Sequence, residues 1–271
     1  MSQIKFSIIV VCLNPAEKLN QTLNSILCQS YDNYEVIVKD GGSRDGSIEG
    51  MRQDKHIRLF QEKDTGIYDA MNQAVSHAEG DYILFLNCGD TFFDKKVLER
   101  VAESIGQSGK SSRLKVFYGN TYSLKNDVLI QEAPKITGFT CYRNIPCHQS
   151  CFYAAQLCRE KPYDLQYRIR ADYDHFLWCY YVAKAEMLCM NLTVSSYEGG
   201  GYSESKENRK RDNREHRLIT TAYMGKGELF RYRLIMAVTL APLRKICAEN
   251  KWFSGFYQGL KKKIYGRNRK K

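Results

Sequence analysis

Polar side chains follow three short apolar segments in the first third of the sequence. CLN occupies positions 12–14, DGGSRDG occupies 40–46 and NCGD occupies 87–90. If the apolar segments are parallel strands, their carboxyl ends meet at one edge of the sheet, where open α/β sheets bind ligands. A carboxylate beside a glycine suits a hard cation, because Mg²⁺ or Mn²⁺ is held by one or two protein carboxylates together with phosphate oxygens and water. Asp90, next to Gly89, is therefore a candidate metal ligand.

The same residue types also have ordinary structural uses. Asp40 and Asp45 could form turns or helix caps, as Asp, Gly and Ser routinely do. Asp90 could begin a turn, or cap the helix that contains Val97 and Leu98. These residues taken singly leave both interpretations open.

Short apolar runs alternate with helical patterns in the first 90 residues. The runs that are typical of buried parallel strands are FSIIVVCL (6–13), YEVIVKD (34–40), IRLF (57–60) and YILFL (82–86). The spacing of apolar residues predicts helices over 17–29 and 67–78. This pattern predicts a βαβαβαβ order, and hence an α/β fold with an open, mostly parallel sheet flanked by helices.

Beyond residue 90 the pattern is weaker. It predicts helices at 97–105 and 172–183, and strands within 115–132, 150–154 and 186–197. We expect one domain over residues 1–203, with halves 1–95 and 96–203, followed by a basic helical tail over 204–271.

The positive charge is concentrated in that tail. Residues 204–271 hold 19 of the 41 Lys and Arg residues but only 6 of the 30 Asp and Glu residues, so they carry the whole excess behind the net charge of +11. This asymmetry favours an anionic partner, either membrane lipid or nucleic acid. The ten cysteines are scattered without a CxxC pair, and the N-terminus lacks the pattern of a signal peptide, so we expect free thiols in a reducing cytosol.

The tail contains two apolar segments. LIMAVTLAPL, at 234–243, is too short to span a bilayer, which takes about 20 residues. The second segment places Trp252, Phe253, Phe256, Tyr257, Leu260 and Ile264 on one helical face, with lysines around it. An aromatic face flanked by lysine is typical of a helix that lies on a membrane, so we expect residues 229–271 to bind an anionic membrane surface. A solvated helix packed on the body is the alternative, and nucleic-acid binding is not expected.

Two segments carry a resemblance to a known family. They are FSIIVVCLNPAEKLNQTLNSILCQSYDNYEVIVKDGGSRDGSIE (6–49) and EKDTGIYDAMNQAVSHAEGDYILFLNCGD (62–90). In this order they resemble the inverting family 2 glycosyltransferases of GT-A fold, in the branch that builds bacterial polysaccharides such as capsule or O-antigen. The resemblance is clear over about residues 5–95, and it continues weakly from CHQSCFY through ADYDHFL to residue 203.

The resemblance implies roles for the donor-side residues. Cys12, Leu13 and Asn14 fall in the segment that lines the nucleotide base. Asp40, with Gly41 and Ser43 in the same segment, matches the aspartate that reads the base edge, commonly of uracil. Asn87 and Asp90 match the DXD-like element, with Asp90 as the metal ligand for Mn²⁺ or Mg²⁺. This chain departs from that element, since its first carboxylate is Asn and its spacer holds Gly, and two alternatives follow: weaker metal binding, or a metal site that rests on Asp90 alone.

Residues of the segment DTGIYDAMN (64–72) could cap a helix or contact the donor sugar. Asp64 or Thr65 could cap the helix that follows. Asp69 and Asn72 lie one helical turn apart, and we include both among the residues that contact the donor sugar or ribose.

An inverting transfer needs a base that deprotonates the acceptor hydroxyl. In RIRADYDHFLWCYY, Ala171 and Asp172 stand where the family usually has Glu and Asp, so the resemblance assigns the base to Asp172. Asp174 is the rival, and it lies about 200° further round a helix. Both acids could instead be ordinary residues of a helix N-terminus, where acidic side chains are favoured.

His148 precedes an apolar strand, and a lone histidine is often structural. The resemblance places it near the acceptor or the donor phosphates. Zinc binding by His148 with Cys147 and Cys151 is rejected, because the spacing matches no common zinc site and no fourth ligand is evident.

The sequence therefore predicts a metal-dependent inverting glycosyltransferase. Its donor would be a nucleotide-sugar, most simply a UDP-sugar, and its acceptor a lipid-linked or polysaccharide hydroxyl. We expect it in the cytoplasm, attached peripherally to the inner face of the cell membrane. Asn87 and Ala171 leave open a nucleotide-binding membrane scaffold whose catalytic site has decayed. A nucleic-acid-binding protein is a weaker rival that rests only on the basic tail.

Overall fold

The computed structural model describes residues 3–109, 114–199 and 208–238. The chain divides into two compact units, 1–219 and 220–271. The predicted boundary at residue 203 falls outside the described residues and stays a prediction.

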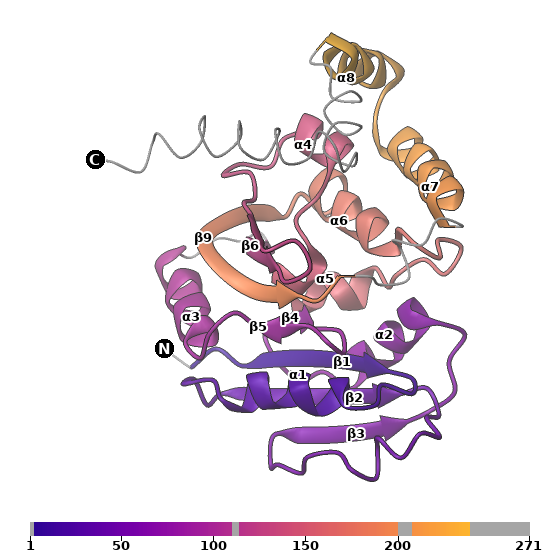
Figure 1. Cartoon of the computed structure of the whole chain (residues 1–271). Helices are drawn as coiled ribbons and strands as arrows, with labels where there is room; N and C mark the ends of the chain where they lie inside the picture. Colours follow the sequence, from indigo (N-terminus) through magenta and orange to yellow (C-terminus); the bar gives the residue numbers. More distant parts are fainter. Residues whose placement is uncertain (1–2, 110–113, 200–207, 239–271) are drawn as a thin grey trace. The chain divides into compact units, whose positions relative to one another are not determined.

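Nine strands of the described residues form one sheet, in the order β3-β2-β1-β4-β8-β6-β9-β5, with β7 paired to β6 (Figure 1). The strands are β1 (Phe6–Cys12), β2 (Tyr34–Asp40), β3 (Ile57–Gln61), β4 (Tyr82–Phe85), β5 (Thr91–Phe92), β6 (Lys115–Ser123), β7 (Val128–Ile130), β8 (Cys151–Ala154) and β9 (Glu186–Tyr197). The strands β3, β2, β1 and β4 are mutually parallel. This confirms the predicted α/β fold with a mostly parallel sheet in its N-terminal half.

The helices lie between and after these strands. In the first unit they are α1 (Lys18–Leu27), α2 (Ile67–Ser76), α3 (Val97–Gln107), α4 (Gly138–Arg143), the 3₁₀ turn η1 (His148–Ser150), α5 (Ala155–Glu160) and α6 (Ala171–Tyr181). Helix α7 (Asn208–Tyr223) crosses the boundary between the units, and α8 (Lys226–Val238) belongs to the second.

One expected helix is absent from the described residues. The βαβαβαβ order required a helix between β2 and β3, but residues 47–50 form only a turn there. The linking segment is rich in Gly, Ser and Asp, which favour turns over helix interiors. The observed order is therefore β1-α1-β2-β3-α2-β4.

Alternating strand residues build a core on each face of the sheet. On one face the strands pack against apolar side chains of α1 and α3, and the fully buried members of this cluster include Ile8, Val10, Val36, Val38, Leu84, Leu19, Leu23, Ile26, Val97, Leu98 and Val101. On the other face the buried residues Ile9, Ile37 and Phe85 lie in one register row, on the side where α2 packs. Helices on both faces explain why the strand segments are almost uniformly apolar.

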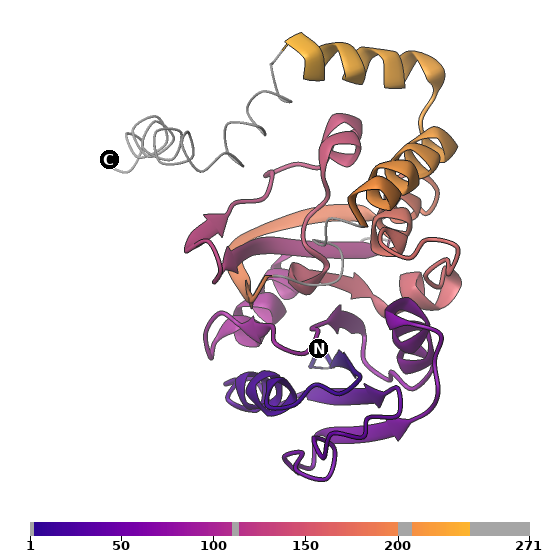
Figure 2. The ribbon, with the colours of Figure 1, turned by 45° about the vertical axis from the view of Figure 1, so that its right-hand side comes forward.

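Two long strands curl the second half of the sheet. β6 and β9 run parallel and curve together, as both views show (Figures 1 and 2). Their register shifts on either side of Asn120, next to Gly119. A Cβ at Gly119 would stand 2.6 Å from the carbonyl oxygen of Leu192 and 2.7 Å from Val194 Cγ2, so only glycine permits this close approach of the strands.

Part of the tail lies within the described residues. Leu229 and Tyr232 of α8 are buried, whereas Phe230, Leu234 and Val238 are 70%, 54% and 73% exposed. The predicted aromatic face at Trp252–Ile264 lies outside the described residues. No helix among those described is long and apolar enough to cross a bilayer.

Candidate active site

The three polar segments that the sequence singled out lie at neighbouring strand ends. Cys12 and Asp40 are register partners at the ends of β1 and β2, and the Gly41 amide donates to the Cys12 carbonyl oxygen at 3.0 Å. On the other side of β1, the segment containing Asn87 and Asp90 continues from β4, with the Leu86 amide donating to the Ile9 carbonyl oxygen at 2.9 Å. The residues thus share one edge of the sheet, where a ligand would lie.

Asp40 is fully buried and well supplied with donors. Its carboxylate accepts from the Ser43 amide at 3.1 Å, from Ser43 Oγ at 2.5 Å and from Gln61 Nε2 at 3.3 Å. These contacts do not test whether Asp40 reads a base edge, so that role of Asp40 stays a prediction.

The loop after β1 is held in an unusual conformation. Asn14 and Ala16 have φ of 49° and 52°, in the left-handed region that non-glycine residues seldom adopt. Three contacts to the loop after β2 hold it: Ser43 Oγ accepts from the Asn14 amide at 2.7 Å, Asn14 Oδ1 accepts from the Arg44 amide at 2.8 Å, and Asp45 Oδ2 accepts from the Ala16 amide at 2.9 Å. Asn14 and Ser43 therefore shape the loop that presents Leu13.

A buried ion pair fixes the segment that precedes α2. Lys39 is fully buried, and its Nζ lies 3.1 Å from Asp64 Oδ2 and 2.6 Å from the Glu62 carbonyl oxygen. A Cβ at Gly41 would stand 2.7 Å from the same Asp64 oxygen. Gly41 is therefore needed for Asp64 to approach the β2 end.

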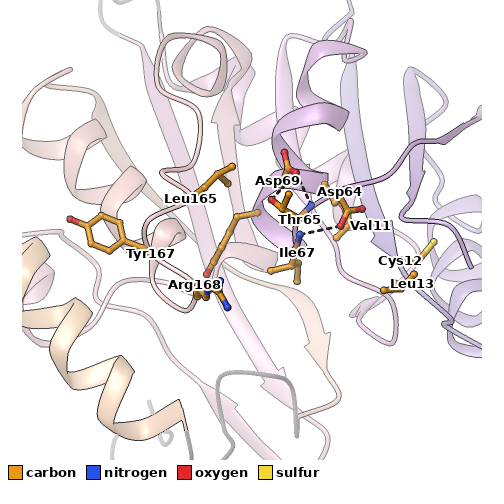
Figure 3. Close-up of a pocket in the computed structure, with 13 residues that line it drawn as sticks. Val11, Cys12, Leu13, Asp64, Thr65, Ile67, Asp69, Leu165, Tyr167 and Arg168 are labelled. Carbon is orange, nitrogen blue, oxygen red and sulfur yellow. Dashed lines mark hydrogen bonds between the residues drawn. The ribbon is translucent and has the colours of Figure 1, made fainter.

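A cavity of about 630 Å³ lies next to these segments, and Leu165, Tyr167 and Arg168 form its facing side (Figure 3). The described residues that line it are Val11, Cys12, Leu13, Asp64, Thr65, Gly66, Ile67, Tyr68, Asp69, Ala70, Leu165, Tyr167 and Arg168. Its size suits a small-molecule ligand. Of the predicted donor residues, Cys12, Leu13 and Asp69 belong to this lining set.

Asp69 and Asn72 make structural contacts. Asp69 Oδ2 accepts from the amide and the hydroxyl of Thr65, at 2.8 and 2.9 Å, and these bonds lower the pKa of the Asp69 carboxyl below its ordinary value. The Asn72 amide makes two bonds, of 2.9 and 2.8 Å, to the backbone of Tyr163. Neither geometry favours contact with the donor sugar or ribose over these structural contacts. The predicted donor-binding roles of Asp69 and Asn72 therefore stay predictions.

Arg168 reaches the cavity from a loop that α7 anchors. Glu215, a buried residue of α7, accepts hydrogen bonds from the backbone amides of Arg168, Ile169 and Arg170, at 3.0–3.1 Å. Arg170 also pairs with Asp212 through two bonds of 2.6 and 2.9 Å. Within the part of the chain that the structure describes, no hydrogen bond or ion pair engages the Arg168 guanidinium. The sequence analysis missed this residue, because nothing local marks a loop arginine as facing a site.

A chain of hydrogen bonds connects the cavity to the predicted base. Tyr68 Oη shares its proton between the Ile169 carbonyl oxygen at 2.7 Å and Asp172 Oδ1 at 3.0 Å. Asp172 Oδ2 lies 3.2 Å from His148 Nδ1, and His148 Nε2 lies 3.1 Å from Asn87 Nδ2. Asn87 Oδ1 is buried and has no partner among the described residues. The structure thus brings together four residues from α2, α6, η1 and the β4 end.

Asp174, the rival acid, faces Lys161 and not His148. Asp174 is buried, and its Oδ2 lies 3.2 Å from Lys161 Nζ. Only Asp172 of the two joins the chain that reaches His148 and Asn87.

Asp90 lies beside a second carboxylate that the sequence analysis did not single out. Asp90 is buried, accepts from Gln149 Nε2 at 2.9 Å and from the Glu198 amide at 3.2 Å, and its pKa is raised above the ordinary value by burial. Gly89 has φ of 96°, and a Cβ there would stand 2.6 Å from Glu198 Oε2. Glu198 in turn pairs with Lys18 at 2.6 Å.

These residues fit a cation that arrives with a phosphate ligand. No three His, Cys, Asp or Glu residues cluster as a metal site in the described ranges. Burial raises the pKa of the Asp90 carboxyl, and the negative charge of Glu198 nearby adds to the rise, so a cation at this point would be favourable. One or two carboxylates are the usual protein share for Mg²⁺ on a phosphate-bearing substrate.

Comparison with known proteins places this fold and site in a class. The profile described as Glycosyl transferase family 2 matches residues 7–159. The chain is 33% identical over 212 residues to a PGL/p-HBAD biosynthesis glycosyltransferase of Mycobacterium tuberculosis, covering 76% of this chain and 81% of that protein. It is 30% identical over 193 residues to an uncharacterized glycosyltransferase of the same species, covering 69% and 71%.

Two solved structures share the fold. Staphylococcus aureus TarS 1-349 in complex with UDP matches with a TM-score of 0.66 at 18% identity, over 92% of this chain and 76% of that one. The mannosyltransferase PcManGT from Pyrobaculum calidifontis, in complex with GDP-Man and Mn²⁺, matches with a TM-score of 0.64 at 14% identity, over 95% and 84%. The fold is that of the GT-A glycosyltransferases. The chain belongs to glycosyltransferase family 2 and is a glycosyltransferase.

Proposed function

We propose that this glycosyltransferase is metal-dependent and inverting, and that it transfers a sugar from a UDP-sugar to a hydroxyl group of a lipid-linked or polysaccharide acceptor. The observation that carries the proposal is the chain from Tyr68 through Asp172 and His148 to Asn87, which joins the cavity wall to the predicted DXD-like element. A donor bound across it would have its sugar carbon next to a proton acceptor.

The cavity would hold the nucleoside part of the donor. Cys12 and Leu13 form its apolar wall at the end of β1, and Leu13 is 60% exposed, so it is available to a base. Arg168 supplies a cation for the diphosphate. The TarS complexes with UDP and with UDP-GlcNAc support uridine as the nucleoside, although the likeness to TarS itself concerns the fold.

Asp90 would hold the divalent cation, with Glu198 as a neighbouring carboxylate. When bound, Mn²⁺ or Mg²⁺ would neutralise the charge that develops on the leaving diphosphate. The Mn²⁺ in the PcManGT complex supports this use of a metal within the same fold. Gln149 fixes one oxygen of Asp90, and this orients the carboxylate for the cation.

Inversion follows from one displacement at the sugar carbon. The acceptor hydroxyl attacks from the side opposite the diphosphate, and a base removes its proton. Asp172 is the predicted base, and of the two acids in its helix it is the one that meets His148.

Helix α8 offers a surface for a membrane. The exposed residues Phe230, Leu234 and Val238 are four positions apart, so they share one helical face, and Arg231 and Arg233 are exposed near them. An apolar stripe flanked by arginine suits the interface of an anionic membrane, where each basic residue contributes about 1 kcal/mol. This supports peripheral attachment at the cytoplasmic face, where a lipid-linked acceptor would be found.

Co-sedimentation with liposomes tests the attachment. The double change Phe230→Ser and Leu234→Ser should lower binding of the full chain to phosphatidylglycerol vesicles, because it removes the apolar stripe. Leu218→Ser is the matched control, since Leu218 is an exposed leucine of α7 at 51% exposure. Equal binding by the double variant and the control would remove α8 from the membrane contact.

A thermal-shift series tests the donor assignment. We expect UDP with Mn²⁺ to raise the melting temperature of the full chain, with a smaller rise for UDP alone. GDP and CDP should have little effect. A larger rise with GDP than with UDP would contradict the uridine assignment.

A further inference from the structure

We infer that Glu215 of α7 is a positioning residue of the active site. Its carboxylate holds the segment 168–170, which presents Arg168 to the cavity and leads directly into the turn of α6 that carries Asp172. The inference rests on the proposed function, because Arg168 and Asp172 are the groups through which Glu215 would act. The family profile ends at residue 159, so α7 would contribute to this site from outside the matched residues.

The Glu215 carboxylate is buried and binds three successive backbone amides. Oε1 accepts from the amide of Arg168 at 3.1 Å, and Oε2 accepts from the amides of Ile169 and Arg170, both at 3.0 Å. Hydrogen bonds from N–H groups to a carboxylate are about twice as strong as those between neutral groups. Loss of the negative charge would therefore weaken all three attachments of the segment together.

Helix α2 holds the same segment from another side. Tyr68 Oη donates to the Ile169 carbonyl oxygen at 2.7 Å and to Asp172 Oδ1 at 3.0 Å. The amide of Ile169 is thus bound to Glu215 on α7, and its carbonyl group is bound to Tyr68 on α2. Since Tyr68 also lines the cavity, these two attachments together set the position of the segment relative to the cavity.

Two functional side chains depend on that position. Arg168 lies at the start of the segment and lines the cavity opposite Ile67 (Figure 3). Asp172 follows the segment by two positions, in the first turn of α6, and its Oδ2 lies 3.2 Å from His148 Nδ1. A misplacement of about 1 Å at such a group can lower a rate about 10²-fold. Glu215 is not among the described residues that line the cavity, so it would act through these side chains.

One face of α7 makes the contacts that place Glu215. Asp212, Glu215 and His216 are three and four positions apart, so they project from the same side of the helix. The Nε2 atom of His216 lies 2.9 Å from the carbonyl oxygen of Tyr142 in α4. The His216 ring stacks on that of Tyr173 in α6, with the ring centroids 5.3 Å apart. This face of α7 therefore contacts α4, the first turn of α6 and the segment that Glu215 holds.

The test compares Glu215→Gln with Glu35→Gln in the full chain. Glutamine keeps the size of the side chain, but it has one acceptor oxygen and an NH₂ group that only donates, so it cannot serve three amides as the carboxylate does. Glu35 is a matched control, because it is a buried glutamate that accepts from Ser7 Oγ and the Glu79 amide, both at 2.7 Å. It lies at the start of β2, and the candidate site lies at the other end of that strand.

Isothermal titration with Mn²⁺ gives the Kd for UDP and for uridine. Turnover is UDP release at saturating UDP-glucose, UDP-galactose, UDP-N-acetylglucosamine or UDP-glucuronate. We expect Glu215→Gln to raise the Kd for UDP about fivefold, to leave the Kd for uridine within about twofold and to lower turnover about tenfold. Glu35→Gln should lower the melting temperature but change neither Kd nor turnover by more than about twofold.

An unchanged Kd for UDP in Glu215→Gln, or equal weakening for UDP and uridine, would overturn the inference. Turnover within about twofold of that of the unchanged chain would show that Asp172 is placed without Glu215. No UDP binding by the unchanged chain would instead count against the proposed function.

A double-mutant cycle tests whether Glu215 acts through Arg168. Glu215→Gln added to Arg168→Gln should raise the Kd for UDP by less than about twofold, because the guanidinium is already absent. A further rise of about fivefold would overturn the inference, since a general loss of structure would weaken both backgrounds alike.

Asp212→Asn replaces Glu215→Gln if that variant does not fold. It loosens the same segment, because Asp212 pairs with the Arg170 side chain at 2.6 and 2.9 Å. We expect the Kd for UDP to rise about threefold and the Kd for uridine to stay unchanged. An equal change for UDP and uridine would overturn the inference in this variant as well.

Discussion

His148 Nδ1 lies 3.2 Å from Asp172 Oδ2, across 24 positions of sequence. The contact joins the 3₁₀ turn η1 to the first turn of α6. Asp174, two residues further along the same helix, is directed to Lys161 instead. Two acids that look equivalent in the sequence therefore have different surroundings, and they should respond differently to the same substitution.

Asp172→Asn should lower turnover by about 10² to 10⁴, because the amide cannot take the proton from the acceptor hydroxyl. UDP affinity should be unchanged. Asp174→Asn should lower the melting temperature, since it leaves Lys161 without its buried partner, and it should keep most of the turnover per folded molecule. Steady-state UDP release and thermal melts on both variants measure these effects. Loss of turnover in Asp174→Asn but not in Asp172→Asn would mean that Asp174 is the functional acid.

Asp90→Ala should abolish transfer and remove the part of UDP stabilisation that depends on Mn²⁺. The physical reason is the loss of the buried carboxylate at the metal position. Asn87→Ala should be milder, because an amide is a weaker metal partner than a carboxylate. Thermal shifts with UDP, with and without Mn²⁺, measure both effects. Full activity in Asp90→Ala would refute the metal assignment.

Arg168→Gln should raise the Kd for UDP about tenfold, which corresponds to about 1.4 kcal/mol. The same substitution should change the Kd for uridine only slightly, because the guanidinium is proposed to contact the diphosphate and uridine has no phosphate. Isothermal titration with UDP and with uridine separates the two. Arg44→Gln is a suitable control, since Arg44 contacts Asn14 through its backbone amide. Equal weakening for both ligands would place Arg168 against the nucleoside.

Glu132 gives a pH dependence of stability. Burial raises its pKa from 4.5 to about 7, and its Oε1 has no partner among the described residues. Below pH 4.5 both the folded and unfolded states carry the proton, so stability is lost only as the pH rises from 4.5 to 7. Glu132→Gln should therefore stabilise the protein by on the order of 3 kcal/mol at pH 8 and by almost nothing at pH 4.

Urea unfolding of Glu132→Gln at the two pH values checks this prediction. Glu103→Gln, at an exposed position of α3, serves as the comparison. The same change in the free energy of unfolding at pH 4 and pH 8 would show that Glu132 does not titrate in this range.

The N-terminal sheet could be predicted because its signals are local. The apolar runs at 6–13 and 34–40 and the helix periodicity at 17–29 depend on neighbouring residues alone, and the structure has β1, α1 and β2 there. The helix expected between β2 and β3 was wrong, because the alternating order was extended over a segment of turn-forming residues.

The site was less predictable because its contacts are long-range. Strand-end positions showed where Asp40, Asn87 and Asp90 would gather, and the family resemblance pointed to Asp172. By contrast, Glu198 meets Asp90 across 108 positions, and Glu215 meets the Arg168 amide across 47. Such pairings depend on where β9 ends beside the β4 end and on the contact of α7 with the loop at 168–170, and no local pattern encodes that.

The most direct test of the central claim is UDP release by the purified full chain from a panel of nucleotide-sugars with Mn²⁺. The panel comprises UDP-glucose, UDP-galactose, UDP-N-acetylglucosamine, UDP-glucuronate, GDP-mannose and dTDP-rhamnose. We predict release from at least one UDP-sugar, loss of that release on chelation with EDTA, and its return when Mn²⁺ is added back. Release only from GDP-mannose or dTDP-rhamnose, or release that EDTA does not change, would contradict the account of a metal-dependent enzyme that uses a UDP-sugar.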